Sequence, residues 1–497
     1  MRMRQMSIST ILIIILLLVS FVLRLSHIKE ATEFFGDQGR TVIHVYDAWQ
    51  AKTIPLVGPT VLSGQYLGPA YYFLIAPFLI MTRFDLVSGA YATVFYGLVG
   101  IVVAFLTFRL LFTSVVAIFL TMLWAFNPMG VASDRFLWEP NLVSVFAMMF
   151  ILGVAVLFRT KKWLLGSVLL SLSTGILVQL HYPNLLFVPL SGVVIFIFWY
   201  IHRPRWFILI RIIGVWGLTF VIMILPFLYY ELAHNFENLG SVITQFLQPT
   251  GLPMGKRQIV FNFIDYANRV MGRVSPVSLG IPIGAMSIIF LTTLWVLLKR
   301  DVFSILMFLS FVCGVGALSL YKGVVYDHYL YFLTPTAYIV IGHWIEVIGA
   351  RQSIKPFVYI GLFVLCAISV YRSVGLVYTT PPRNDIGRVR AVVDVVKKEL
   401  GNEAFSFGLA ASPSFSDLHY RAGFKMARIN AEKITGSDNH IVLVCESNVC
   451  PFIDHGDKIQ TFCNEDHCKG DYPIVDLYKY KTRVVKIDDV IVLFGIQ

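Results

Sequence analysis

Long apolar segments recur from Ile8 to Tyr378, separated by short polar connections. A helix that crosses a bilayer needs about 20 predominantly apolar residues, and most of these segments reach or approach that length. We therefore expect about 11 transmembrane helices in the first part of the chain. Their expected positions are 8–25, 86–110, 113–131, 141–158, 163–181, 184–201, 209–230, 277–298, 302–320, 329–349 and 356–378.

One apolar segment, Gly68–Met81, is too short to be read in the same way. If it crossed the membrane, every later loop would change sides and the basic clusters would face outward. We expect instead an interfacial helix at Leu67–Met81 on the outer face, with Tyr71 and Tyr72 at the level of the lipid headgroups. A second short helix is expected at Gln38–Ala51.

The pattern changes after Pro381-Pro382. Asn384 or Asp385 can cap a helix that runs to Leu400 and ends at Gly401. Short apolar runs then predict strands, at Ala404–Leu409, Ile441–Cys445 and Val490–Phe494.

The fold class that follows is a polytopic all-α membrane protein with a small C-terminal α/β soluble domain. We place the transmembrane module at residues 1–379 and the soluble domain at residues 380–497. Two large outer loops, about 26–85 and 231–275, are expected to form the functional site of the module.

Composition agrees, because 57% of the residues are hydrophobic and only 14% are charged. The net charge of +11 resides in the membrane part. Residues 1–379 carry 25 Lys and Arg against 13 Asp and Glu, a balance of +12, whereas residues 380–497 carry 15 against 16, a balance of −1. Basic residues hold cytoplasmic loops inside, so the charge needs no nucleic-acid partner.

The basic clusters also predict the topology. All of them fall on one side if the N-terminus is cytoplasmic, which makes the protein a multi-pass protein of the cell (cytoplasmic) membrane with an extracytoplasmic C-terminal domain. The clusters are Arg2 and Arg4, Arg159 to Lys162, Arg203 and Arg205, Lys299 and Arg300, and Arg351 and Lys355. Of the 13 acidic residues in the membrane part, only Asp301 and Glu346 then lie on the cytoplasmic side. This bias suggests that the outer face carries the chemistry.

The strongest candidate for that chemistry is Asp37, which follows the first apolar segment and precedes Arg40 by three residues. On a helix, residues at this spacing can address one pocket. The alternative is that Asp37 only caps the helix that follows it. Because a cap does not require the flanking Gly36 and Gly39, we favour catalysis.

A second candidate is Glu139, which precedes Pro140 at a helix start in a segment that also contains Asp134. Glu139 is either a second pocket carboxylate or a favourable charge at a helix N-terminus. Further pocket candidates at the same face are His181, Tyr182, Asp327, His328 and Tyr329. For each histidine a structural or interfacial role is the simpler interpretation.

The second outer loop carries Lys256, Arg257, Arg269 and Arg273, on the side of the membrane where basic residues are disfavoured. Taken singly they suit headgroup contact or solvation; as a group they suit a phosphate. In the tail, Cys445, Cys450, Cys463 and Cys468 are disulfide candidates, favoured over a zinc site by their spacing and by the oxidising compartment. Their connectivity is left open.

Asp37-Gln38-Gly39-Arg40 after a first transmembrane helix resembles the Asp-x-x-Arg signature of GT-C glycosyltransferases, in particular family 39. That family includes protein O-mannosyltransferases and the bacterial aminoarabinose transferase of lipid A. Trp138-Glu139-Pro140-Asn141 resembles its acidic-Pro element, and Tyr229–Phe236 resembles the start of its second outer loop. Gln38 stands where protein mannosyltransferases typically have Glu, which argues against protein mannosylation.

The resemblance implies a hexosyl- or pentosyltransferase that uses a polyprenyl-phosphate-linked sugar, with a lipid, glycan or protein as acceptor. Asp37 would act as general base and Glu139 would orient the substrate. Arg40, with some of the loop cations, would bind the donor phosphate. A divalent metal is possible but not required, since cationic side chains can serve the phosphate.

Two other functions are compatible with a multispan protein. A lipid-linked-sugar flippase or transporter predicts internal repeats and polar residues at mid-membrane, and neither is evident. An O-antigen-ligase-like polymerase would favour basic and histidine residues in a large outer loop. Asp37 at the end of the first helix is the feature that distinguishes a GT-C enzyme from both.

Overall fold

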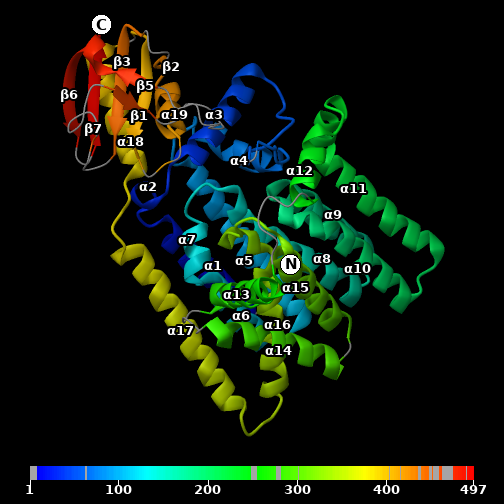
Figure 1. The fold of residues 1–497 in the computed structure, drawn as a ribbon. Helices are drawn as coiled ribbons and strands as arrows, with labels where there is room; N and C mark the ends of the chain where they lie inside the picture. Colours follow the sequence, from blue (N-terminus) through cyan, green and yellow to red (C-terminus); the bar gives the residue numbers. More distant parts are fainter. Residues whose placement is uncertain are drawn as a thin grey trace, which may run out of the picture.

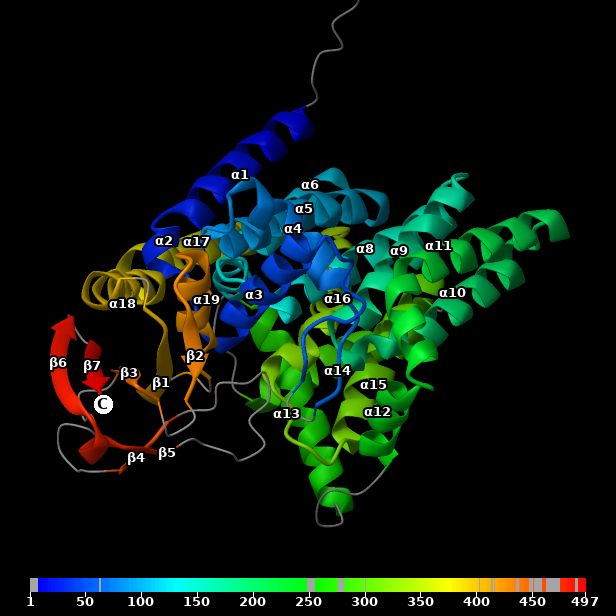
Figure 2. The same cartoon turned by 90° about the horizontal axis from the view of Figure 1, so that it is seen from above.

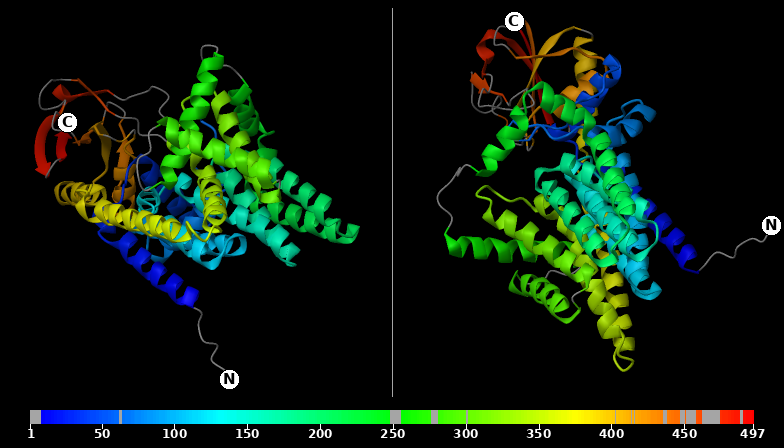
Figure 3. Two further views of the ribbon diagram at one scale, coloured as in Figure 1. Left: turned by 90° about the horizontal axis from the view of Figure 1, so that it is seen from below. Right: turned by 90° about the vertical axis from the view of Figure 1, so that its right-hand side faces the viewer.

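The computed structural model describes residues 8–61, 64–247, 255–275, 281–299, 301–401, 403–412, 414, 416–434, 438–446, 450, 458–461, 474–487 and 490–497. A bundle of long helices carries a small domain containing β-strands at one end (Figure 1). Helix α17 leads from the bundle to this domain (Figure 3).

The first half of the bundle contains α1 (Ile8–Leu25), α2 (Ile28–Ala31), α3 (Gly36–Ala51), α4 (Ala70–Met81), α5 (Ser88–Leu111), α6 (Ser114–Ala125), α7 (Pro128–Ser133), the 3-10 helix η1 (Glu139–Leu142), α8 (Val143–Arg159) and α9 (Trp163–Leu180). The second half contains η2 (Tyr182–Leu186), α10 (Phe187–His202), α11 (Trp206–Ala233), α12 (Glu237–Leu247), α13 (Lys256–Val274), α14 (Ile281–Lys299), α15 (Val302–Leu320), η3 (Asp327–Leu333), α16 (Thr334–Gly349) and α17 (Lys355–Thr379).

Eight helices in the described part of the chain are long and apolar enough to cross a membrane: α5, η1–α8, α9, η2–α10, α11, α15, η3–α16 and α17. The other three expected spans coincide with the shorter apolar helices α1, α6 and α14. Together with the small sheet at the C-terminal end, these helices confirm the predicted fold class.

Helix α8 occupies the centre of the bundle, and most of its side chains are buried. Helix α9 packs closely along it because both present glycine at the contact. A Cβ on Gly153 would lie 2.7 Å from the backbone of Leu170, and one on Gly166 would lie 2.8 Å from that of Leu157. Small residues of this kind allow membrane helices to approach one another.

The end of α1 is fixed by two neighbouring side chains from the segment after α7. The buried guanidinium of Arg24 pairs with Asp134 at 2.9 Å. Arg135 donates hydrogen bonds to three carbonyls, those of Leu23, Arg24 and Ser26. The last carbonyls of a helix have no partner within it, so Arg135 satisfies acceptors that would otherwise be unpaired.

Helix α4 matches the expected short helix, but one expectation about it was wrong. Tyr71 and Tyr72 do not face the headgroups; they are 0% and 3% exposed, inside the protein. The amide of Ala70 donates to the side chain of Gln179, and Gly68 fits against the same side chain. The start of the helix is therefore bonded to α9, and its tyrosines are turned into the protein.

The loop between α3 and α4 is bound to the loop that follows α11. The amide of Tyr66 donates to Asn238 at 2.7 Å, and Gln65 donates to Ser241 at 2.8 Å. Asn238 in turn donates to the buried carboxylate of Glu231 at 2.8 Å. These bonds join the two large loops, residues 26–85 and 231–275, which we call the first and second loops.

The C-terminal domain consists of α18 (Asp385–Leu400), β1 (Phe405–Ala411), α19 (Leu418–Met426), β2 (Ala431–Lys433), β3 (His440–Cys445), β4 (Lys458–Gln460), β5 (Ile474–Asp476), η4 (Leu477–Lys479), β6 (Lys481–Ile487) and β7 (Val490–Ile496). The five-stranded sheet has the order β2-β1-β3-β7-β6. Strand β1 is parallel to β2 and β3, whereas β7 is antiparallel to β3 and β6. The expected helix and all three expected strands are present, with ends shifted by two residues or fewer.

The domain docks on the first loop, and α19 lies along α3 (Figure 2). Three ion pairs surround this contact: Arg383 with Glu33 at 3.0 Å, Arg390 with Asp85 at 2.8 Å, and Lys425 with Asp47. Exposed pairs each contribute at most about 1 kcal/mol, so the packing of α19 on α3 carries more of the docking than the charges do.

That packing depends on Gly39 in the first turns of α3. A Cβ on Gly39 would lie 2.4 Å from the carbonyl oxygen of Leu418 and 2.5 Å from the amide nitrogen of His419. Both atoms belong to backbone and cannot swing aside. Only glycine therefore lets the start of α19 approach α3 this closely.

We expect Gly39→Ala to destabilise the protein by about 1–3 kcal/mol, the usual cost of overpacking. The measurement is the apparent melting temperature of the purified protein in detergent. Gly240→Ala is the matched control, because Gly240 is an exposed helical glycine with open space around its Cα. An equal response of the two variants would contradict the close packing of α19 on α3.

Candidate active site

Asp37 is the second residue of α3 and projects at the N-terminus of that helix. Its carboxylate accepts a hydrogen bond from Arg40 at 2.8 Å. The Asp37 side chain is 54% exposed, whereas that of Arg40 is 8% exposed. The buried guanidinium thus holds a carboxylate that remains accessible from outside.

Asp37 does not cap its own helix. That position belongs to Phe35, and the side chain of Gln38 accepts a hydrogen bond from the Phe35 amide at 2.8 Å. The alternative role considered for Asp37 is therefore wrong. The flanking glycines, however, have a structural explanation. Gly36 lies against the segment that precedes α19, and Gly39 lies against the first residues of α19.

Glu139, the first residue of η1, is brought to the same place. It interacts electrostatically with both Asp37 and Arg40. Tyr71, on α4, interacts with the same three groups, and its hydroxyl has no hydrogen-bond partner among the described residues. Two carboxylates, a guanidinium and a buried phenol from α3, α4 and η1 therefore converge.

A cluster of aromatic and imidazole rings continues from η1. Trp138, next to Glu139, contacts His328 with ring centroids 4.7 Å apart. His328 and His181 each contact Tyr329, at 4.7 and 4.6 Å, and their own centroids are 5.2 Å apart. The structure thus brings together three of the expected pocket residues, His181, His328 and Tyr329, and joins them through Trp138 to the segment that contains Glu139.

The other three expected pocket residues are engaged in bonds within the protein. Asp134 is paired with Arg24, the hydroxyl of Tyr182 donates to the carbonyl of Tyr66 at 2.6 Å, and Asp327 is paired with Arg269 at 3.3 Å. These contacts hold loops in place.

The four loop cations do not form one group. Lys256 and Arg257 are exposed at the start of α13, whereas Arg273 is at its end. Seventeen residues of helix separate Lys256 from Arg273, about 25 Å at 1.5 Å per residue. The two ends of α13 therefore cannot bind the same phosphate. Arg269 already has two carboxylate partners, Asp265 and Asp327.

Arg273 is the cation with hydrogen-bonding capacity to spare. It is 7% exposed, and its Nε and Nη1 have no partner among the described residues. Its guanidinium lies 3.5 Å from the ring centroid of Tyr331, and Arg273 lines a small cavity. The polar residues around this cavity include Asn127, Asp134, Asn141, Ser144 and Thr334. Because Asn141 belongs to η1, the cavity adjoins the helix that begins with Glu139.

No three His, Cys, Asp or Glu side chains gather as a metal site within the described part of the chain. Cys445 and Cys450 are buried in the C-terminal domain. Cys463 and Cys468 lie outside the described residues, so the expected disulfides stay a prediction.

Two parts of the site were not predicted. Tyr71 was assigned to the headgroups because a short apolar helix with adjacent tyrosines is typical of an interface. The contribution of Ser414 and Leu418, next to Asp37, was also missed. The glycines around Asp37 were the available signal, since they indicate that another backbone comes close.

Searches against protein-family models and against curated proteins find no match. Solved structures do match. The aminoarabinose transferase ArnT from Cupriavidus metallidurans, bound to undecaprenyl phosphate, superposes with a TM-score of 0.60 at 13% identity, covering 97% of each chain. Its apo state gives a TM-score of 0.61 at 12% identity and the same coverage.

The archaeal oligosaccharyltransferase AglB from Archaeoglobus fulgidus, in complex with an inhibitory peptide and a dolichol-phosphate, gives a TM-score of 0.50 at 10% identity. It covers 88% of this chain and 69% of the archaeal one. Identities this low establish the fold and not the activity. The predicted architecture is confirmed: the chain has the same fold as ArnT and AglB.

Proposed function

We propose that this protein is an integral-membrane glycosyltransferase that transfers a sugar from a polyprenyl-phosphate-linked donor to an acceptor on the extracytoplasmic face. The observation that carries the proposal is the accessible carboxylate of Asp37, which is held by Arg40 and interacts electrostatically with Glu139, within a GT-C fold. The acceptor is a lipid, a glycan or a protein.

Asp37 is the general base of this reaction. A sugar phosphate already has a good leaving group, so the demanding step is activation of the acceptor hydroxyl. A carboxylate within hydrogen-bond reach can remove the hydroxyl proton as the oxygen attacks the anomeric carbon. The bond to the donor phosphate breaks on the opposite face, and this single displacement inverts the anomeric configuration. The exposure of Asp37 gives the acceptor access to the base.

Glu139 has a different role because it is less accessible and starts a helix. It orients substrate hydroxyls and keeps Arg40 between two carboxylates. Arg40 is thereby fixed beside the reacting centre, where a guanidinium stabilises the charge that develops on the departing phosphate.

Arg273 is the second phosphate ligand in this proposal. It lines a small cavity beside η1 and has two nitrogens without a partner among the described residues, and a planar guanidinium binds phosphate in a bidentate manner. Undecaprenyl phosphate and dolichol-phosphate are present in the ArnT and AglB structures, which supports a polyprenyl donor for this chain. The rings of Trp138, His181, His328 and Tyr329 form an apolar surface on which a sugar can stack.

We expect Asp37→Asn to lower kcat by about 100-fold or more, because general base catalysis contributes about 10²–10⁴-fold. Binding of the donor should persist, since the asparagine still accepts a hydrogen bond from Arg40. The measurement is release of polyprenyl phosphate from a panel of polyprenyl-phosphate sugars by the protein in nanodiscs.

Glu30→Gln is the matched control, because Glu30 is an exposed carboxylate of the same loop. It should retain wild-type activity. If Asp37→Asn turned over the donor as fast as the wild type, the assignment of Asp37 as base would be wrong.

The two ends of α13 allow a direct test of the phosphate site. Arg273→Gln should raise the KM for the donor by about 10–100-fold, since hydrogen bonds to charged groups contribute about 1.5–3 kcal/mol. Arg257→Gln, at the distant end of the same helix, should leave this KM within about twofold. Steady-state kinetics with varied donor concentration distinguishes the two. Equal effects of both substitutions would place the phosphate elsewhere.

A further inference from the structure

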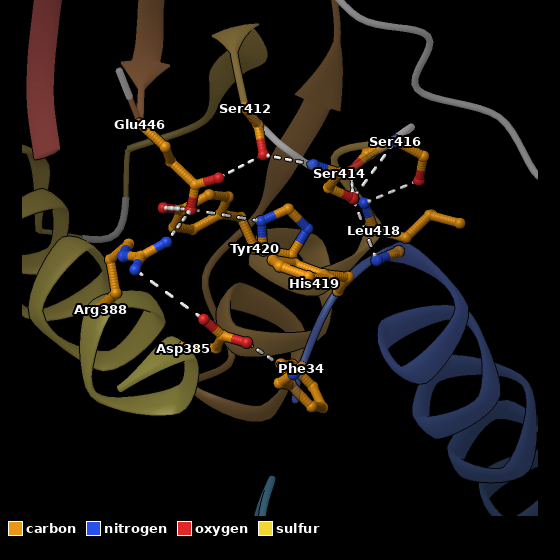
Figure 4. Close-up of polar contacts among 12 residues, drawn as sticks. Phe34, Asp385, Arg388, Ser412, Ser414, Ser416, Leu418, His419, Tyr420 and Glu446 are labelled. Atoms are coloured by element: carbon orange, nitrogen blue, oxygen red, sulfur yellow. Dashed lines mark hydrogen bonds and ion pairs between the residues drawn. The ribbon is translucent and has the colours of Figure 1, made fainter. Parts of the chain in front are cut away.

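Glu446 lies just beyond the carboxyl end of strand β3, beside Ser412, which follows the neighbouring strand β1 (Figure 4). Its side chain is only 2% exposed. Burying a carboxylate without partners is costly, so a carboxylate in this position needs several donors.

The groups around Glu446 come from α18, from α19 and from the segment that follows β1. Tyr420 donates to one carboxylate oxygen at 2.6 Å and Ser412 donates to the other. Arg388 of α18 approaches at 3.4 Å, and the ring of His419 lies 3.7 Å away. Burial alone would raise the pKa of Glu446, but the interaction with His419 and the hydrogen bonds of Ser412 and Tyr420 lower it to about 2. The group is therefore a fixed negative charge.

One series of hydrogen bonds leads from this carboxylate to Gly36. Ser412 bonds to Glu446 and accepts from the amide of Ser414 at 2.9 Å. The hydroxyl of Ser414 accepts from the amide of Gly36 at 3.2 Å and donates to the carbonyl of Ser416 at 2.8 Å. Gly36 is the residue immediately before Asp37.

A second series leads from the same carboxylate to Phe34. Arg388, which contacts Glu446, also lies 3.8 Å from the carboxylate of Asp385. Asp385 is 4% exposed and accepts a hydrogen bond from the amide of Phe34 at 3.1 Å. Asn384 or Asp385 was expected to cap α18; Asn384 is the cap residue, and the side chain of Asp385 bonds to the first loop.

Both series end on backbone amides of residues 34 and 36, and between them Phe35 packs its ring against His419. We infer that Glu446 is a positioning residue: it anchors the two series of hydrogen bonds through which the C-terminal domain holds residues 34–36, and thereby Asp37, in place for reaction. This inference rests on the proposed function of Asp37. A displacement of about 1 Å at a reacting group can cost about 100-fold in rate, so the backbone beside Asp37 needs such support.

The first test is Glu446→Gln in the full-length protein in nanodiscs. The amide keeps the size of the side chain but replaces one acceptor by a donor, which disrupts the contacts with Ser412 or Arg388. We expect kcat to fall by about 10-fold or more with the KM for the donor unchanged, because the loop moves while the phosphate site remains. A purely structural role would lower the amount of active protein, which by itself lowers the apparent kcat at unchanged KM, so kcat is expressed per donor-binding site in each preparation.

Two further variants distinguish a loss of positioning from misfolding. Ser414→Ala removes the acceptor for the Gly36 amide together with the local bonds to Ser416, and it should lower kcat in the same direction by a smaller factor. Glu432→Gln is the matched control, because Glu432 is an exposed carboxylate of β2 in the same domain. It should leave kcat and KM at wild-type values.

Hydrogen–deuterium exchange tests the inference without any assay of activity. Exchange of the peptide that contains Phe34 and Gly36 should be faster in Glu446→Gln and Ser414→Ala than in the wild type and in Glu432→Gln. If exchange of this peptide were unchanged, or if kcat were unchanged in both variants while Asp37→Asn was inactive, the positioning role would be refuted and the proposed function would stand. If Asp37→Asn were fully active, the proposed function would fail instead, and faster exchange would still show the coupling of Glu446 to the loop.

Discussion

The requirement that every backbone amide and carbonyl in hydrocarbon has a partner determines the rest of this architecture. The described part of the chain meets this requirement because its membrane-crossing segments are helices, and the irregular backbone lies at the helix ends. At the end that carries the C-terminal domain, side chains complete the pairing: Arg135 for the carbonyls of α1 and Gln38 for the amide that precedes α3. Groups suited to chemistry are found where such irregular backbone is allowed.

The charged side chains at this end of the bundle differ in how many of their polar atoms have partners. This difference distinguishes side chains that join helices from those that we propose to bind substrate. Arg24 bonds to Asp134 and Ser20 and so joins α1 to the segment after α7. Arg273 is also buried but has two nitrogens without partners among the described residues. Buried polar groups are normally satisfied, and this exception is the reason for proposing Arg273 as a phosphate ligand. Asp37 is the opposite case, a paired group that stays exposed.

Much of this could be predicted from local patterns. Hydropathy located the spans, and Asn384 and Gly401 marked the two ends of α18. The spacing of Asp37 and Arg40 predicted that both side chains lie on one side of a helix, where they form an ion pair. Contacts made over long distances in the sequence could not be predicted. The inward rotation of Tyr71 depends on α9, and the separation of Lys256 from Arg273 depends on α13 being one straight helix. The proximity of positive charges in a sequence does not imply that they share a site.

The hydrogen bond between Gly36 and Ser414 joins residues 378 positions apart. During synthesis the first loop is made long before the segment that holds it. Contacts of such high sequence separation form only after the entropy of closing the long intervening chain has been overcome. The backbone beside Asp37 therefore reaches its final setting only after Ser414 has been made and its domain has folded. A polypeptide that stops before Ser414, even one fully inserted in the membrane, lacks this contact.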